Sequence, residues 1–344
     1  MATFEIFEQD IERCHHIIGM DVWRTLAGKK IFFTGGTGFV GKWMLGALLD
    51  ADERLSLDCK ITLLSRNPEN FFAEWPELSR RLNCIPGDVR NFALPVDAVD
   101  LVVHAATDVA SARSPDQIFD DCVDGTRRVL DLISGCGAKR ALLVSSGAVY
   151  GPFPQGMSHV SEKYLGGPDT LAAASAYAEG KRVSEWLMAR ATGHGVEVAI
   201  ARLFAVVGPH LPLDKHFAIG NFIAAALANK AFSISGDGTP RRSYLYAADM
   251  AAWLWVVALR GQSGTAYNVG SEDSISIYDL AKRVAYIAGS DGEVECAERI
   301  SGTLVQHYVP DVTLAKKDLC LQEPLDLNEA ISRTIRWYRE RQQK

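Results

Sequence analysis

The chain of 344 residues contains no Cys-x-x-Cys pair, although it has seven cysteines. Because these cysteines are odd in number and widely spaced, they indicate free thiols in a reducing compartment and disfavour a disulfide framework or a zinc site. The first ten residues lack the basic start and the apolar stretch of a secretory signal. No segment supplies the ~18 uninterrupted apolar residues of a membrane span. We therefore expect a cytoplasmic protein with no metal site and no membrane partner.

The chain has no excess of positive charge, because its formal net charge is −6. This balance argues against a general nucleic-acid-binding protein. With 48% hydrophobic and 23% charged residues, the chain can bury a large core. An anionic substrate would need arginine and lysine side chains gathered locally in its cleft.

A glycine-rich turn lies near the start of the chain. Residues 31–33 form a short apolar run typical of a buried parallel strand, and apolar residues at helical spacing follow Gly38. Gly35, Gly38 and Gly41 would supply a sharp turn, a close approach to a pyrophosphate and a close contact between helix and strand. The alternative is a purely structural turn. The expected cofactor contacts of this turn also include Thr37, Phe39 and Val40.

The end of the second expected strand, residues 60–64, bears on the choice of cofactor. An acidic residue there would bind the ribose of NAD, but the chain has Ser65 and Arg66. A guanidinium and a hydroxyl could pair with the 2′-phosphate of NADP, so NADP is favoured. The alternative is that Arg66 stacks on adenine or points to water while the enzyme uses NAD.

Two further strand ends complete the expected dinucleotide site. Asp88, followed by Val89, ends the strand near residue 83 where such folds contact the adenine amino group, although Asp88 could instead cap a helix or turn. The strand at 101–104 is followed by small residues against which a dinucleotide could lie. These residues are Ala105, Ala106 and Thr107.

Tyr177 and Lys181 form the most informative pair in the sequence. Their four-residue spacing puts both side chains on one face of a helix, where the ammonium would lower the pKa of the phenol. An isolated pair of this kind is usually a solvated pair of helix neighbours. Here it follows the glycine-rich turn and Ser146, which ends an apolar strand at the edge where ligands bind in open α/β folds. Together these features indicate a redox enzyme.

The ordered motifs resemble the extended short-chain dehydrogenase/reductase family, in its NAD-dependent epimerase/dehydratase branch that modifies nucleotide sugars. The resemblance implies that Tyr177 is the acid or base on a sugar oxygen and that Ser146 binds the same oxygen. It implies that Lys181 holds the nicotinamide ribose and that Arg242 meets the substrate diphosphate. The other matching motifs are Asp88-Val89, His104-Ala105-Ala106, Val149-Tyr150-Gly151, Arg202-Leu203-Phe204, Gly236-Asp237-Gly238-Thr239 and Tyr267-Asn268-Val269-Gly270.

The chain departs from the family pattern around the substrate. Sugar dehydratases of the family carry acidic residues directly after the catalytic hydroxyl, but here Gly147 and Ala148 follow it, which disfavours a 4,6-dehydratase. His307 lies where relatives often place a phosphate-binding arginine. His216 and Asn221 lie in the segment that contacts the sugar in relatives, although an unaccompanied histidine is usually packed or solvated. We count Gly147, His216, Asn221 and His307 as candidate substrate contacts.

Alternating strands near 31, 61, 83, 101, 141 and 197 predict a Rossmann-type doubly wound parallel sheet with a smaller C-terminal substrate lobe. We expect three parts: a helical arm at 1–27, an NAD(P)-binding domain at 28–204, and a lobe at 205–344 from which about 242–260 return to the main domain. The resemblance implies a homodimer formed through the helices at 115–134 and 175–191.

The sequence therefore predicts an NAD(P)-dependent enzyme acting on a nucleoside-diphosphate sugar, as a keto-sugar reductase or an epimerase. A nucleotide-sugar dehydratase or decarboxylase is the alternative within the family. A cofactor-binding regulatory protein without catalysis is the alternative outside it.

Overall fold

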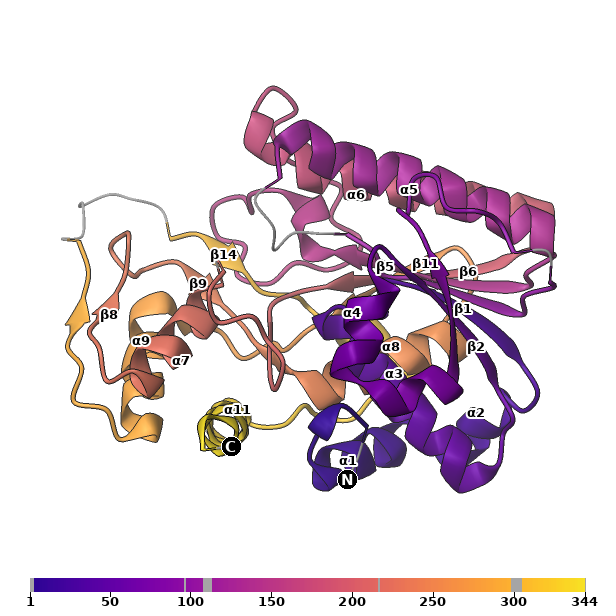
Figure 1. The fold of residues 1–344 in the computed structure, drawn as a ribbon. Helices are drawn as coiled ribbons and strands as arrows, with labels where there is room; N and C mark the ends of the chain where they lie inside the picture. Colours follow the sequence, from indigo (N-terminus) through magenta and orange to yellow (C-terminus); the bar gives the residue numbers. More distant parts are fainter. Residues whose placement is uncertain (1–2, 96, 108–112, 216, 298–304, 344) are drawn as a thin grey trace.

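The computed structural model describes residues 3–95, 97–107, 113–215, 217–297 and 305–343. Seven parallel strands form the central sheet in the order β11-β6-β5-β4-β1-β2-β3, and this confirms the predicted Rossmann-type fold (Figure 1). The strands are β1 (Lys30–Thr34), β2 (Lys60–Ser65), β3 (Leu82–Pro86), β4 (Leu101–His104), β5 (Arg140–Ser146), β6 (Glu197–Leu203) and β11 (Thr265–Val269).

Helices cover both faces of the sheet because its strands are apolar on both sides. Phe33 packs in the core that includes α3 (Phe39–Leu55) and α8 (Ala247–Arg260), whereas the neighbouring Phe32 packs in the core that includes α5 and α6. Figure 1 shows α5 and α6 side by side above the sheet, with α3 and α8 below it. The helices α5 and α6 are residues Pro115–Cys136 and Ala176–Ala191.

The strand β11 was not among the expected strands. It lies at the edge of the sheet, where Thr265 to Val269 pair in parallel with Ala199 to Leu203 of β6. The chain therefore returns from the lobe to the Rossmann unit over α8 and β11 together, further along the sequence than the 242–260 segment that the pattern indicated. This return brings Asn268 into contact with Tyr150, whose hydroxyl donates to Asn268 Oδ1 at 2.7 Å.

The lobe is built from short strands and helices. A three-stranded sheet has the order β12-β9-β14, and two further pairs are β13-β8 and β10-β7. The short strands are β7 (Val206–Val207), β8 (Phe232–Ser233), β9 (Arg241–Arg242), β10 (Leu245–Tyr246), β12 (Ile275–Ser276), β13 (Val294–Glu295) and β14 (His307–Tyr308). The helices are α7 (Ala218–Leu227), α9 (Ile277–Ala288), α10 (Thr313–Leu319) and α11 (Leu327–Gln342).

The first residues of the chain form short helices that pack beneath the sheet. They are η1 (Thr3–Glu5), α1 (Glu8–Ile18) and α2 (Met20–Arg24), and α1 packs against α8. Arg13 Nε donates to Asp249 Oδ1 at 2.7 Å, and Asp249 is fully buried. The remaining helical segments are α4 (Pro68–Glu74), η2 (Pro76–Arg80), η3 (Gly147–Tyr150), η4 (Ala173–Ser175) and η5 (Thr192–His194).

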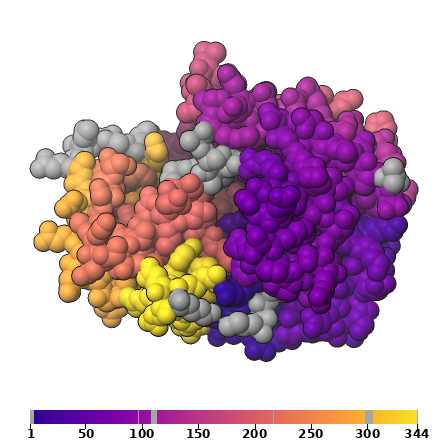
Figure 2. All heavy atoms as spheres, in the orientation of Figure 1, coloured from indigo at the N-terminus to yellow at the C-terminus, as the bar shows by residue number. Residues whose placement is uncertain are grey.

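The C-terminal helix α11 contacts both the lobe and the first residues of the chain. Figure 2 shows the C-terminal helix α11 (yellow) between the lobe (orange) and the Rossmann unit (purple). Trp337 Nε1 of this helix donates to the Glu5 carbonyl at 3.0 Å, so α11 contacts η1 directly. None of the helices in the described residues is long and apolar enough to cross a membrane.

Candidate active site

Ser146 and Tyr177 meet at the carboxyl edge of the sheet. Ser146 ends β5, and its Oγ accepts a hydrogen bond from Ala148 N at 3.1 Å, which holds the hydroxyl at the start of η3. Tyr177 lies in the first turn of α6, and its side chain forms a hydrogen bond with the Ser146 side chain. The structure thus brings together the two hydroxyls that the sequence predicts.

Lys181 lies one helical turn after Tyr177 and is only 4% exposed. Its Nζ donates to the Val144 carbonyl at 2.8 Å and lies 6.0 Å from the centre of the Tyr177 ring. Burial raises the pKa of Tyr177 above its ordinary value and outweighs the effect of Ser146, while burial lowers the pKa of Lys181. The sequence predicts a lowered tyrosine pKa, and the structure differs because the phenol is enclosed and the ammonium is turned toward a backbone carbonyl.

Tyr308 is a third hydroxyl at this centre that the sequence analysis did not place in the site. A hydrogen bond with the Ser146 side chain acts on Tyr308 as well, against the burial that raises its pKa. The Tyr308 ring lies 4.8 Å from the ring of Phe204, and the Arg242 guanidinium lies 5.5 Å from its centre. Two phenols from distant parts of the chain therefore share one serine hydroxyl.

The glycine-rich turn has the shape that a bound pyrophosphate requires. Gly35 has a φ of 75°, and a Cβ there would lie 2.6 Å from the backbone of Ala105. A Cβ on Gly41 would lie 2.2 Å from the Gly35 carbonyl oxygen, so the helix and the turn are in close contact. At Gly38 a Cβ would meet only that same oxygen, at 3.5 Å. Packing thus explains Gly35 and Gly41, whereas Gly38 faces open space at the N-terminus of α3, as a ligand site would need.

Comparison with known proteins identifies the family. The model of the NAD dependent epimerase/dehydratase family matches residues 31–270. The chain belongs to this family. Similar proteins include UDP-glucuronic acid decarboxylase 6 from Arabidopsis thaliana, which is 30% identical over 88% of this chain and 86% of its own length. UDP-glucuronic acid decarboxylase 1 from Xenopus tropicalis is 29% identical over 90% of this chain and 72% of its own length.

Solved structures of this family share the fold. The structure of epimerase Mth375 from Methanothermobacter thermautotrophicus has a TM-score of 0.79 and 22% identity, covering 96% of this chain and 97% of its own. UDP-glucose 4-epimerase from Thermotoga maritima has a TM-score of 0.76 and 21% identity over 91% of this chain and 99% of its own. These structures confirm the fold, and the match of the family model confirms the family resemblance drawn from the motifs.

As a family member, the protein has the residues to hold a nicotinamide dinucleotide. The turn at Gly35 to Gly41 fits the pyrophosphate, and Thr37, Phe39 and Val40 lie at the start of α3 beside it. Thr107 Oγ1 donates to the Ala106 carbonyl at 2.6 Å, within the segment that follows β4. Val89 packs against α5, because a Cβ on Gly125 would lie 2.9 Å from its Cγ1.

The side chains of Ser65 and Asp88, at the ends of β2 and β3, form hydrogen bonds with neighbouring residues of the chain. Ser65 is 7% exposed, and its Oγ accepts a hydrogen bond from Asn67 N at 3.2 Å. Arg66, which follows it, is exposed. Asp88 Oδ1 accepts hydrogen bonds from Arg90 N and Nε at 3.0 and 2.8 Å, and these bonds help lower the Asp88 pKa. Asp88 therefore caps a turn in this structure, as the alternative to adenine binding predicts.

The candidate substrate residues are spread around Tyr308. Arg242 pairs with Tyr308 and Arg241 pairs with His307 across β9 and β14. Burial and then the positive charge of Arg241 lower the pKa of His307, so this histidine is a neutral donor or acceptor at pH 7 and not a second cation. Asn221 is exposed in the first turn of α7. His216 lies outside the described residues.

Gly147 has a packing role that explains the missing acidic residue. A Cβ at this position would lie 2.6 Å from the ring of Phe204, and Phe204 in turn contacts Tyr308. Any larger side chain would displace that ring. The turn after Ser146 is therefore closed to a carboxylate at Gly147, and the following residue is Ala148.

A buried polar network supports the strand that carries Ser146. Ser145 Oγ donates to Glu185 Oε1 at 2.6 Å, and Arg202 Nη2 donates to Glu185 Oε2 at 2.7 Å. Arg202 Nη1 also donates to the Tyr150 hydroxyl at 2.9 Å, which donates to Asn268 Oδ1 at 2.7 Å. These groups satisfy one another, so the network positions β5 and η3.

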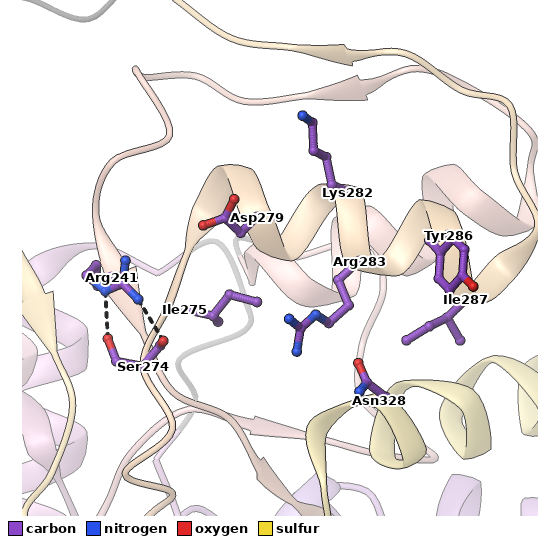
Figure 3. Close-up of a pocket in the computed structure, with 9 residues that line it drawn as sticks. All are labelled: Arg241, Ser274, Ile275, Asp279, Lys282, Arg283, Tyr286, Ile287 and Asn328. Carbon is purple, nitrogen blue, oxygen red and sulfur yellow. Dashed lines mark hydrogen bonds between the residues drawn. The ribbon is translucent and has the colours of Figure 1, made fainter.

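A pocket among the described residues lies in the lobe, beside β9 and β12. It has a volume of about 700 Å³. In Figure 3, Arg241 is held by two hydrogen bonds to Ser274, both 2.8 Å long, while Lys282 and Arg283 project from α9. None of the predicted catalytic residues lines this pocket, whose lining is Arg241, Ser274, Ile275, Asp279, Lys282, Arg283, Tyr286, Ile287 and Asn328.

Proposed function

We propose that the protein oxidises and re-reduces a sugar carbon of a nucleoside-diphosphate sugar and that a uronic acid is decarboxylated between the two steps. The main support for this proposal is the cluster of Ser146, Tyr177 and Lys181 at the carboxyl end of β5. Relatives named as UDP-glucuronic acid decarboxylases, which match about nine tenths of the chain, support the uronic acid as substrate. The closed turn at Gly147 supports a reaction that needs no carboxylate there.

The chemistry follows from the position of the hydroxyls. Tyr177, in its phenolate form, accepts the proton of the sugar C4 hydroxyl, and Ser146 donates to the same oxygen as it becomes a carbonyl. A bound nicotinamide would supply the hydride acceptor for the oxidation and the hydride donor for the reduction. The carbonyl makes the sugar carboxylate a β-keto acid, so carbon dioxide can leave while the electron pair delocalises onto the oxygen held by Tyr177 and Ser146. This differs from a dehydration, which needs further acid and base groups at neighbouring carbons.

Epimerisation is the second candidate. It requires the same oxidation and reduction, and the keto intermediate only has to rotate before the hydride returns. The pair Gly147-Ala148 is compatible with epimerisation, because this reaction needs no acidic residue after Ser146. The keto-sugar reductase expected from Arg66 is less well supported, because it would consume external cofactor.

The experiment is a comparison of two substrates at a cofactor concentration well below that of the substrate. We expect UDP-glucuronic acid to give carbon dioxide and the corresponding UDP-pentose, detected by trapping and by nuclear magnetic resonance. UDP-glucose should remain unchanged. Epimerised UDP-glucose without carbon dioxide release would support the second candidate, and a stoichiometric need for added NADPH would contradict both.

The preference between NAD and NADP is a separate hypothesis. The family is NAD dependent, and Arg66 is an exposed cation at the end of β2 where an acidic residue would favour NAD. If Arg66 binds a 2′-phosphate, Arg66→Ala should weaken NADP binding about tenfold or more and leave NAD binding nearly unchanged. Isothermal titration with both cofactors measures this, with the exposed Arg283→Ala as the control. An equal effect on the two cofactors would contradict the phosphate assignment.

Two other expectations belong with this function. We propose a homodimer formed through α5 and α6, which lie side by side on one face of the sheet. The location in the cytoplasm stays a prediction from the sequence.

A further inference from the structure

Tyr308 is placed at the candidate reaction centre by its strand and by the contacts of its ring with Phe204 and Arg242. Its strand pairs with β9, so that Tyr308 lies opposite Arg242. The next residues are anchored to the Rossmann unit, since Val160 N donates to the Val309 carbonyl at 3.0 Å and Asp311 N donates to the Val160 carbonyl at 2.9 Å. These bonds hold the backbone on both sides of Tyr308 in place beside the candidate reaction centre.

Because two phenols lie beside one serine hydroxyl, we expect them to transfer protons to different atoms of the substrate. Tyr177 and Tyr308 both interact with the Ser146 side chain. Burial raises the pKa of Tyr308 above its ordinary value, so this phenol carries its proton at neutral pH. The proposed oxidation uses one of them, on the sugar oxygen. The family motif reserves that task for Tyr177 on α6, which leaves the proton of Tyr308 without a role in the redox steps.

The proposed decarboxylation needs a proton donor that the oxidation does not supply. When carbon dioxide leaves, the enolate carbon must gain a proton before the carbonyl is reduced again. No carboxylic acid follows Ser146, because Phe204 covers Gly147 and residue 148 is alanine. Phe204 is also the ring that packs on Tyr308 at 4.8 Å, so the same packing that closes the usual acid position holds this phenol in place.

We infer that Tyr308 is a second catalytic acid, which donates its proton to the sugar carbon from which carbon dioxide departs. This inference rests on the proposed function. The bond between C5 and the carboxylate carbon breaks, carbon dioxide leaves, and the electron pair stays in the enolate. The O–H bond of Tyr308 then breaks and a C–H bond forms at C5. The phenolate, which lies beside the Arg242 cation, regains a proton from water, so the balance is one carboxylate and one proton consumed for one carbon dioxide released.

The test is Tyr308→Phe assayed with UDP-glucuronic acid in D₂O. In the wild type, a single fixed donor should place deuterium at C5 of the product in one configuration only. The variant keeps the ring packing and the cofactor site, so we expect normal cofactor binding and melting temperature. Its turnover should fall by about 10²-fold, with deuterium in both configurations, because water then protonates the enolate from either side.

The matched control is Tyr286→Phe, which removes an exposed phenol from α9 in the same lobe and should match the wild type. Wild-type turnover and a single deuterium configuration in Tyr308→Phe would overturn the assignment of Tyr308 alone. A wild-type protein that releases no carbon dioxide would instead contradict the proposed function, and the inference with it. A slow variant that keeps a single configuration would show that Tyr308 only positions Ser146, and would also overturn the inference.

Discussion

In the proposed mechanism, the redox chemistry depends on the side chain of Tyr177. In Tyr177→Phe the ring still packs, but no group can take the proton from the sugar hydroxyl. We expect kcat/KM to fall by about 10²–10⁴-fold while cofactor affinity stays nearly unchanged. Steady-state kinetics and isothermal titration of the cofactor measure the two quantities. Turnover at the wild-type level would remove Tyr177 from the mechanism.

His104 shows how one buried residue sets the pH dependence of stability. It is 3% exposed, with Nδ1 2.8 Å from Thr34 Oγ1 and Nε2 3.2 Å from Thr126 Oγ1. Burial lowers its pKa to about 3, and the charge of Lys181 adds to this effect. The unfolded chain therefore binds this proton below pH ~6.5 while the folded protein does not. Its contribution is fully present above that pH and is lost as the pH falls toward 3.

We predict that His104→Gln, which keeps polar contacts but cannot become charged, flattens this dependence. Between pH ~7 and ~4.5 the wild type should lose about 3 kcal/mol of unfolding free energy through His104, and the variant should not. Urea denaturation at the two pH values measures the difference. The exposed His194→Gln is the control. Equal losses in wild type and His104→Gln would show that other groups dominate acid unfolding.

At the residue scale, short patterns in the sequence anticipated which side chains lie together, while their catalytic roles stay a prediction. The helical spacing of Tyr177 and Lys181 and the strand ending at Ser146 are short patterns, and the structure brings these residues together. Tyr308 was missed because its contact with Ser146 joins β14 to β5. That contact depends on the pairing of β14 with β9 inside the lobe, and no local sequence pattern predicts this pairing.

At the scale of elements, apolar runs identified six of the seven strands of the sheet. The seventh, β11, is Thr-Ala-Tyr-Asn-Val, in which a tyrosine and an asparagine interrupt the apolar run. Both are buried because their polar atoms are used: the Tyr267 hydroxyl accepts from Gln262 N at 3.1 Å, and Asn268 Nδ2 donates to the Val160 carbonyl at 2.8 Å. A hydropathy pattern cannot anticipate this satisfaction of polar groups by distant segments.

The helix α1 is fixed to the lobe through one buried carboxylate. Asp10 is fully buried; the Tyr246 hydroxyl donates to it at 2.6 Å, and Arg333 of α11 pairs with it at 2.5 Å. Removing the carboxylate leaves the buried Tyr246 hydroxyl without its acceptor and leaves Arg333 paired, among the described residues, only with Glu329, at 2.6 Å.

We predict that Asp10→Ala lowers the free energy of unfolding by about 3–5 kcal/mol. The control is Asp21→Ala in α2, whose exposed carboxylate pairs with Arg24 at 3.0 Å and should leave the unfolding midpoint unchanged. Urea denaturation compares the two variants. Similar midpoints for both would show that the helices 3–24 contribute little to the fold.

At the scale of the whole molecule, one face of the Rossmann unit presents α5 and α6 together (Figure 1). Trp186 on α6 is 60% exposed, and tryptophan is enriched in protein interfaces. If the predicted homodimer forms here, Trp186→Glu should convert it to a monomer. Analytical ultracentrifugation measures the mass, and Tyr286→Glu, at an exposed aromatic residue of the lobe, is the control. A wild-type monomer, or an unchanged mass in Trp186→Glu, would contradict the prediction.

The central claim is that one sugar carbon is oxidised and then reduced again on the same molecule. The most direct test is turnover of UDP-glucuronic acid carrying deuterium at C4, with unlabelled cofactor and mass spectrometry of the product. The account predicts that the UDP-pentose retains the deuterium at C4, because the hydride that leaves during oxidation returns to the same carbon. Product formed with the label lost, or label found in the cofactor pool, would contradict an internal redox cycle.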